Sequence, residues 1–93
     1  MTELGPKLRD FAKSGDEENV KKIVTEGGLD AINYKDRIGY TPLHMASMFG
    51  HKNICTILLE GGADKTITNS DGETASDVAK GITLGNYIRD FKK

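Results

Sequence analysis

Three side chains in this sequence are suited to metal binding or nucleophilic catalysis, namely His44, His51 and Cys55. A zinc site needs three or four ligands around one centre. Cys55 falls on an apolar stripe, where a thiol is usually buried and unreactive, and a structural role is open to His44. We therefore expect no metal site, no cofactor and no cysteine nucleophile.

No other residue pattern in the sequence is typical of catalysis. The paired glycines at 27–28 and 61–62 do not form either glycine-rich phosphate-binding motif, and helix C-termini explain them. Asp64 and Asp71 have no acid–base partner at a suitable spacing. The sequence therefore predicts a protein that is not an enzyme.

The segment Thr41-Pro42-Leu43-His44 predicts the start of a helix. The Thr41 side chain is a good N-cap, and Pro42 suits the first helical position because its missing N–H has no intrahelical partner there. His44 lies three residues after Thr41, where its neutral imidazole can reach back to the hydroxyl or backbone N–H of Thr41. We expect His44 to be structural.

These residues belong to a pattern that repeats at an interval of 33 residues. At this shift Gly39, Thr41 and Ala46 align with Gly72, Thr74 and Ala79. At a shift of 34, Glu60-Gly61-Gly62 aligns with Glu26-Gly27-Gly28. Self-similarity at such a period is typical of a solenoid, in which each unit is one supersecondary structure.

Each unit predicts two short helices and a turn. The second helices carry apolar residues at helical spacing: Val20, Ile23 and Val24; Ile54, Cys55, Leu58 and Leu59; and Leu84, Tyr87, Ile88 and Phe91. In the third unit the pattern Thr74-x-x-Asp77 predicts a short first helix through Val78 and Ala79. The final helix is expected to begin between 82 and 86.

The run Thr41-Pro42-Leu43-His44-Met45-Ala46 matches the signature T-P-L-H-x-A without a gap, and the match continues through Gly50-His51 and Leu58-Leu59. On these residues the chain resembles the ankyrin repeat family. The resemblance implies an all-α repeat solenoid, in which helix-turn-helix pairs are joined by β-turn or hairpin fingers. It gives framework roles to seven residues: Thr41, Pro42, Leu43, His44, Ala46, Gly50 and His51.

The resemblance covers nearly the whole chain and implies a single ankyrin-repeat domain over 1–93, which we expect to be a complete small protein. A full repeat at 35–67 lies between an N-terminal capping repeat at 5–34 and a C-terminal capping repeat at 68–93. The first unit has one extra residue around Gly28, so its finger is expected to bulge or to be displaced. The third unit has Ala75-Ser76-Asp77 where the central one has Pro42-Leu43-His44, which fits a cap.

Composition limits the partners and the compartment. The net charge is −1 with 29% charged residues, so nothing in the electrostatics favours a nucleic acid or an anionic membrane. No apolar run approaches the roughly 20 residues that span a bilayer. A single cysteine cannot form an internal disulfide, which favours a reducing compartment. We expect a cytoplasmic protein, with the nucleus as an alternative.

The resemblance also implies where a partner binds. Members of this family generally bind other proteins through the finger turns and the exposed side of each first helix. The corresponding positions of the central repeat are Lys35, Arg37, Ile38, Tyr40, Met48 and Phe49. Four of them are large and apolar or aromatic, as at recognition surfaces. In the alternative interpretation, Met48 and Phe49 turn back and pack against the next repeat.

The resemblance thus implies a non-catalytic interaction module, an adaptor or regulator, that binds another protein through the central repeat. The alternative is a constitutive subunit or self-associating structural unit of a larger assembly. We expect a monomer or weak self-association.

Overall fold

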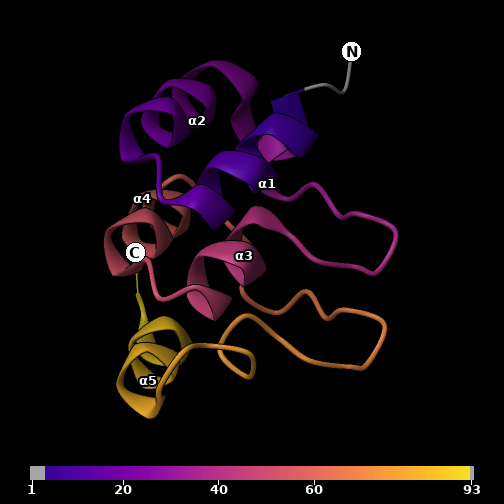
Figure 1. Ribbon diagram of the computed structural model, residues 1–93, viewed down its shortest axis with the longest axis vertical. Coiled ribbons are helices and arrows are strands. Elements are labelled where there is room, and N and C mark those ends of the chain that lie inside the picture. Colours follow the sequence, from indigo (N-terminus) through magenta and orange to yellow (C-terminus); the bar gives the residue numbers. More distant parts are fainter. Residues whose placement is uncertain (1–3, 93) are drawn as a thin grey trace.

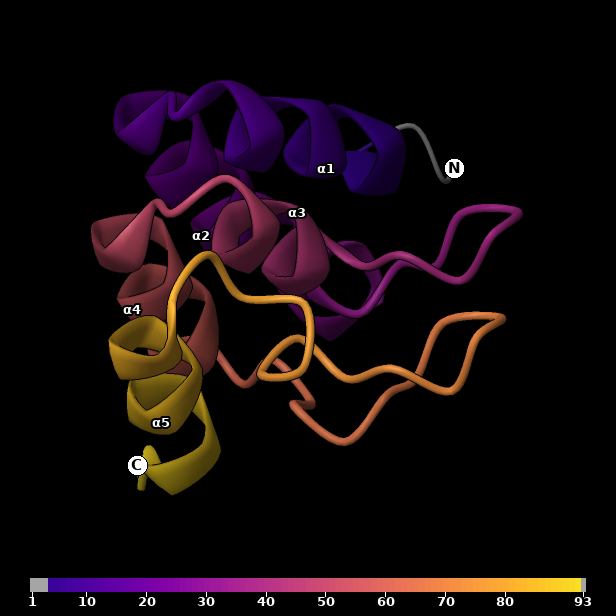
Figure 2. The ribbon, with the colours of Figure 1, turned by 60° about the horizontal axis from the view of Figure 1, so that its bottom comes forward.

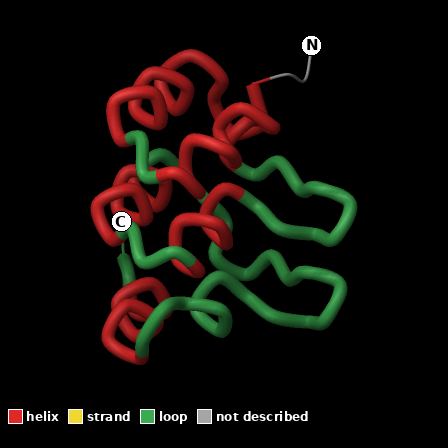
Figure 3. Tube along the Cα trace, viewed as in Figure 1, coloured by secondary structure: helices red, strands yellow, loops and turns green. Residues whose placement is uncertain are grey.

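The computed structural model describes residues 4–92 and contains five helices over these residues (Figure 1). They are α1 (Leu4–Ser14), α2 (Glu17–Ile32), α3 (Pro42–Met48), α4 (Lys52–Glu60) and α5 (Ile82–Asp90). The described part of the chain has no strand, and its two long loops project together from one side of the helices (Figure 3). The predicted all-α repeat architecture is confirmed.

The helices form two layers that follow the units of the sequence. Helices α1 and α3 lie on the side from which the loops project, and α2, α4 and α5 form the other layer (Figures 1 and 2). The core between the layers draws on every helix, because each carries apolar residues at helical spacing. Its most buried large side chains are Leu8, Val20, Ile32, Leu43, Ile54, Leu58 and Ile88.

A glycine with positive φ joins the helices of the first two units. Gly15 (φ +84°) separates α1 from α2, and Gly50 (φ +79°) separates α3 from α4. Gly15 has a second constraint, because a Cβ there would lie 2.9 Å from the His51 ring. A larger residue there would have to displace the His51 ring.

The two projecting loops are the fingers, each a tight turn built around one side chain. Asp36 Oδ1 accepts hydrogen bonds from the N–H groups of Ile38 (3.0 Å) and Tyr40 (2.9 Å). In the second finger, 33 residues on, Asn69 Oδ1 accepts from Asp71 and Glu73, both at 2.9 Å. The same turn therefore recurs in two consecutive units, because Asp and Asn both cap their own turns.

The fingers lie side by side (Figure 2). The Ser70 N–H donates to the Ile38 carbonyl at 2.8 Å, joining one tip to the other. Gly39 (φ +90°) permits this approach, because a Cβ there would lie 2.8 Å from Asn69 Cα.

The first unit differs from the expected bulged or displaced finger. Gly28 has φ +61° and ψ −157°, which kinks α2, but the helix resumes and ends only at Ile32. The extra helical turn places Ala31 and Ile32 in the core, where they are 3% and 1% exposed. Burial of these two side chains therefore outweighs the break at the glycine pair.

The third unit also differs from expectation. Thr74 and Asp77 form the predicted capping pair, with Thr74 N to Asp77 Oδ2 at 2.9 Å and Asp77 N to Thr74 Oγ1 at 3.2 Å. The segment makes only a turn, however, so the prediction of a short helix there was wrong. The Lys80 N–H donates to the Ser47 carbonyl of the central unit at 2.8 Å, which directs the chain away from a helical path. Helix α5 begins at Ile82, within the expected range.

Candidate functional site

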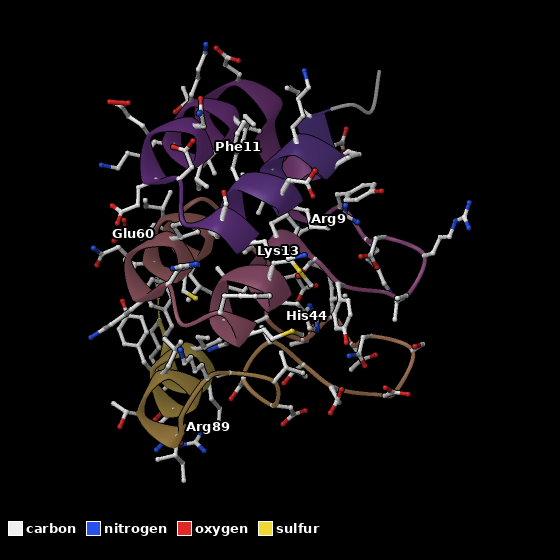
Figure 4. The ribbon with its side chains drawn as sticks, in the orientation of Figure 1. Arg9, Phe11, Lys13, His44, Glu60 and Arg89 are labelled. Carbon is white, nitrogen blue, oxygen red and sulfur yellow. The ribbon has the colours of Figure 1, made fainter. Side chains whose placement is uncertain are left out.

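His44 lies at the base of the fingers, where it joins the central unit to the third (Figure 4). Its Nδ1 accepts from the Thr41 N–H at 3.2 Å and lies 2.8 Å from Thr41 Oγ1. Its Nε2 lies 2.9 Å from the Glu73 carbonyl. This pattern requires the neutral tautomer with the proton on Nε2, which donates to Glu73. Burial lowers the pKa of His44 and favours the same neutral form.

With both ring nitrogens bonded, His44 has no lone pair free for a metal or a substrate. The capping box on α3 is complete, because the Thr41 hydroxyl also accepts from the His44 N–H at 3.2 Å. Among the residues that the structure describes, no three His, Cys, Asp or Glu side chains cluster as metal ligands would.

Cys55 is fully buried in α4. Burial raises the pKa of its thiol to about 12. At neutral pH the group is therefore a protonated thiol without access to solvent, which is a packing role.

Ser47 is a contact residue that the sequence analysis did not single out. It is fully buried in α3, and its Oγ lies 2.8 Å from the Ala75 carbonyl and 3.0 Å from the His44 carbonyl. Its small polar side chain directly after the T-P-L-H-x-A signature was the available signal, since a small polar residue on a buried helix face often meets a neighbouring backbone.

The first two units are also joined by polar contacts. Nε2 of His51 lies 3.1 Å from the Lys13 carbonyl, to which it donates. Arg9 reaches from α1 to the first finger, with Nη1 3.1 Å from Asp36 Oδ2 (Figure 4). No local pattern predicts the Arg9–Asp36 pair, because its partners are 27 residues apart and meet only once the units stack.

The six residues expected to bind a partner fall into two groups. Lys35, Arg37 and Ile38 lie together on the first finger and are exposed, Ile38 to 53%. They line a hollow between the fingers, opposite Thr68 and Ser70 of the second finger. Within the described residues, neither Lys35 nor Arg37 forms an ion pair with a carboxylate.

The other three residues belong to the approach to α3 and to its two ends. Tyr40 is half-buried, with its ring centroid 5.8 Å from that of His44. Met48 is half-buried against the core. Phe49 caps the far end of α3, is 43% exposed, and has Lys13 Nζ 5.7 Å from its ring centroid.

The expected apolar patch is therefore divided. Helix α3 has seven residues, so about 10 Å separate Phe49 from the start of the helix beside the finger. The structure brings Lys35, Arg37 and Ile38 together, and it places Phe49 in a separate exposed spot beside Lys13.

Pairs of helices stacked in register, with a turn projecting from each junction, define an α-helical repeat protein. The chain belongs to the ankyrin repeat family: the family model described as "Ankyrin repeats (3 copies)" matches residues 8–81. In the described residues, no helix is long and apolar enough to cross a bilayer.

Several curated proteins are similar in sequence. Protein phosphatase 1 regulatory subunit 12A of Mus musculus is 39% identical over 74 residues, which are 80% of this chain and 7% of that protein. Protein phosphatase 1 regulatory subunit 27 of Homo sapiens is 39% identical over 71 residues, 76% of this chain and 45% of that protein. An ankyrin repeat-containing protein of Schizosaccharomyces pombe is 33% identical over 88 residues, 95% of this chain and 42% of that protein. The chain thus spans less than half the length of each of these relatives.

Proposed function

We propose that this chain is a non-catalytic adaptor or regulator that binds another protein through the central repeat. Ankyrin repeats are protein-interaction modules. The observation that carries the proposal is the first finger, where exposed Ile38 lines the same hollow as Lys35 and Arg37, two cations that have no ion pair in the described residues. An apolar residue within a charged rim is the usual composition of an interface.

Two of the three named relatives are regulatory subunits of protein phosphatase 1, which supports a regulatory role. It also makes the catalytic subunit of that phosphatase the first purified protein to test for binding. Both ring nitrogens of His44 are bonded, Nε2 of His51 donates to the Lys13 carbonyl, and Cys55 is buried, which supports a non-catalytic role.

The test compares a finger variant with a matched control. Lys35→Glu combined with Ile38→Asp alters the finger, and Lys22→Glu combined with Ile82→Asp makes the same two changes at exposed positions elsewhere. Circular dichroism checks that both are folded. Affinity capture from cell lysate with quantitative mass spectrometry, followed by calorimetric titration of the captured protein, should show a partner that the finger variant loses and the control retains. Equal capture by both variants would refute binding through the finger.

Phe49 requires a separate variant, because it lies apart from the finger. If the first-helix surface takes part, Phe49→Ser should weaken the same partner while leaving the fold intact. Tyr40 and Met48 are less suitable probes, because both are half-buried and their replacement also disturbs packing.

The alternative role, as a self-associating or constitutive subunit, has a direct test in solution. Size-exclusion chromatography with light scattering should give the mass of one chain, 10.1 kDa, over a wide concentration range. A larger mass at micromolar concentration would favour the alternative. We place the protein in the cytoplasm or nucleus because its single cysteine suits a reducing compartment.

A further inference from the structure

Ser70 lies at the tip of the second finger and is exposed. Its neighbours Asp71 and Gly72 are exposed as well, so an enzyme can approach the hydroxyl from outside. The tip is held by a few turn hydrogen bonds and by the single bond from the Ser70 N–H to the Ile38 carbonyl. Opening such a segment locally costs much less than unfolding the stack.

The sequence around Ser70 is acidic on its C-terminal side. Asp71 follows directly, and Glu73 is the third residue after the serine. Serine followed by carboxylates at these positions suits a kinase whose peptide groove is basic, because opposite charges attract in the encounter.

Across the hollow between the fingers, Ser70 faces basic residues. Ser70 lines the hollow between the fingers together with Lys35 and Arg37. Asp36 also lines it, but its carboxylate is held by Arg9 and by the N–H groups of Ile38 and Tyr40. The two cations are therefore available to an anion placed at Ser70.

We infer that Ser70 is a phosphorylation site and that Lys35 and Arg37 hold its phosphate across the hollow between the two fingers. The bound phosphate then prevents a partner from reaching the exposed residues of the first finger. The γ-phosphoryl group of ATP would be transferred to Ser70 Oγ: the bond from phosphorus to the ADP oxygen breaks, the bond to Oγ forms, and the hydroxyl proton is released. At pH 7 the product carries a charge of about −1.5 to −2 and offers three acceptor oxygens.

A phosphate on Ser70 would change which charges the first finger presents to a partner. It would pair with Lys35 and Arg37, which line the same hollow as Ile38, and arginine binds phosphate through two parallel hydrogen bonds. The partner-binding consequence rests on the proposed function, whereas the modification and its electrostatic pairing do not.

The first experiment asks whether Ser70 is the acceptor. The full chain is incubated with ATP and casein kinase II, an acidic-directed kinase, and the modified residue is located by mass spectrometry. Phosphate on Ser70, lost in Ser70→Ala and slowed at least tenfold in a variant with Asp71→Asn and Glu73→Gln, supports the inference. Thr68 is a built-in control, because it has Asp71 three residues later. Phosphate on Thr68 alone, or none, would overturn it.

The second experiment asks whether the cations hold the phosphate, and it needs no partner. The chain is made with phosphoserine at 70, and the second phosphate pKa is taken from the pH dependence of its ³¹P chemical shift. Relative to an unfolded peptide with the same flanking carboxylates, this pKa should be lower by about 0.5. The difference should disappear when Lys35 and Arg37 are both changed to Gln, and persist in Lys21→Gln on α2. Equal pKa values in protein and peptide would refute the pairing.

The third experiment uses the partner found by capture. Phosphoserine at 70 should weaken its binding at least tenfold, and unchanged affinity would overturn the regulatory role. Loss of binding in the finger variant together with unchanged affinity of the phosphorylated chain would leave the proposed function intact and reject only this regulation.

Discussion

His44 makes two contacts of different kinds with its two ring nitrogens. Nδ1 completes the cap of its own helix, and Nε2 holds the Glu73 carbonyl of the next unit. Both contacts require the neutral ring. A second proton, on Nδ1, would face the Thr41 N–H and remove its acceptor.

Protonation should therefore couple to folding. The pKa of His44 is lowered, chiefly by burial, while in the unfolded chain it is about 6.5. Between these two values the unfolded chain binds a proton that the folded chain does not. The free energy of unfolding should then fall as pH falls through about 6.5, until the folded pKa is reached. Urea unfolding at pH 7.5 and 5.5 measures this change.

The matched control for this prediction is His44→Gln, since glutamine is a usual residue at this capping position and does not titrate. The variant should lose less stability than the wild type between the two pH values. Parallel losses would show that His44 does not carry the effect.

Cys55 provides a second test at the residue scale. Because burial raises its pKa to about 12 and removes it from solvent, iodoacetamide at pH 8 should modify the folded chain at least about 100-fold more slowly than the urea-unfolded chain. The reaction is followed by mass spectrometry. Rapid modification under native conditions would mean that α4 opens readily or that the thiol is exposed.

At the scale of elements, the contact between the fingers depends on Gly39. Gly39→Ala and Gly72→Ala both place a side chain at positive φ (+90° and +78°), but only at Gly39 would the new Cβ meet Asn69 Cα, at 2.8 Å. Strain in the left-handed region costs about 1–2 kcal/mol in each. Gly39→Ala should lower the free energy of unfolding by about 1–3 kcal/mol more than Gly72→Ala does, because the new Cβ overpacks the contact between the fingers. Equal losses in urea unfolding would mean that the fingers do not pack closely in solution.

Helix α4 owes its position to the side chains that it buries. Leu58 is 0% exposed, so Leu58→Ala should lower the free energy of unfolding by about 2–5 kcal/mol. Ile82, 81% exposed at the start of α5, is the control, and Ile82→Ala should change stability by no more than about 0.5 kcal/mol. Chemical denaturation of the two variants measures both values. A comparable loss in both would contradict the described packing.

Much of the element order could be predicted from the sequence because it depends on local signals. Thr41, Pro42 and His44 are close in sequence and specify the start of α3 by themselves. The stripe of Ile54, Leu58 and its neighbours likewise specifies α4.

The structure departs from the sequence-based prediction where contacts between residues far apart in the sequence determine the backbone conformation. Helix α2 continues past Gly28 because Ala31 and Ile32 gain burial against other helices. The segment after Thr74 stops at a turn because Lys80 bonds to the Ser47 carbonyl. For the candidate site, the sequence was enough to assign Lys35, Arg37 and Ile38 to a finger, whereas the separation of Phe49 from them depends on the length and placement of α3.

At the scale of the whole molecule, we expect a marginally stable stack. A solenoid usually needs about three repeats, and here the third unit has a turn in place of its first helix. A partner that binds only the folded stack should therefore raise its free energy of unfolding, by about 2.7 kcal/mol when the free partner is at 100 times its dissociation constant. The melting temperature should rise clearly as a result.

Differential scanning fluorimetry with and without the captured partner measures this gain. The variant carrying Lys35→Glu and Ile38→Asp should show none. A melting temperature unchanged by saturating partner in the wild type would count against stabilisation on binding.

The contacts between units have a consequence for how such chains evolve. His44, Ser47 and His51 each reach a main-chain carbonyl of the adjacent unit, at Glu73, Ala75 and Lys13 respectively. Every amino acid supplies that carbonyl, so these contacts do not depend on the neighbour's side chain. A unit that carries the Thr-Pro-Leu-His and Gly-His segments can therefore be duplicated or exchanged beside unrelated neighbours while its exposed finger diverges freely.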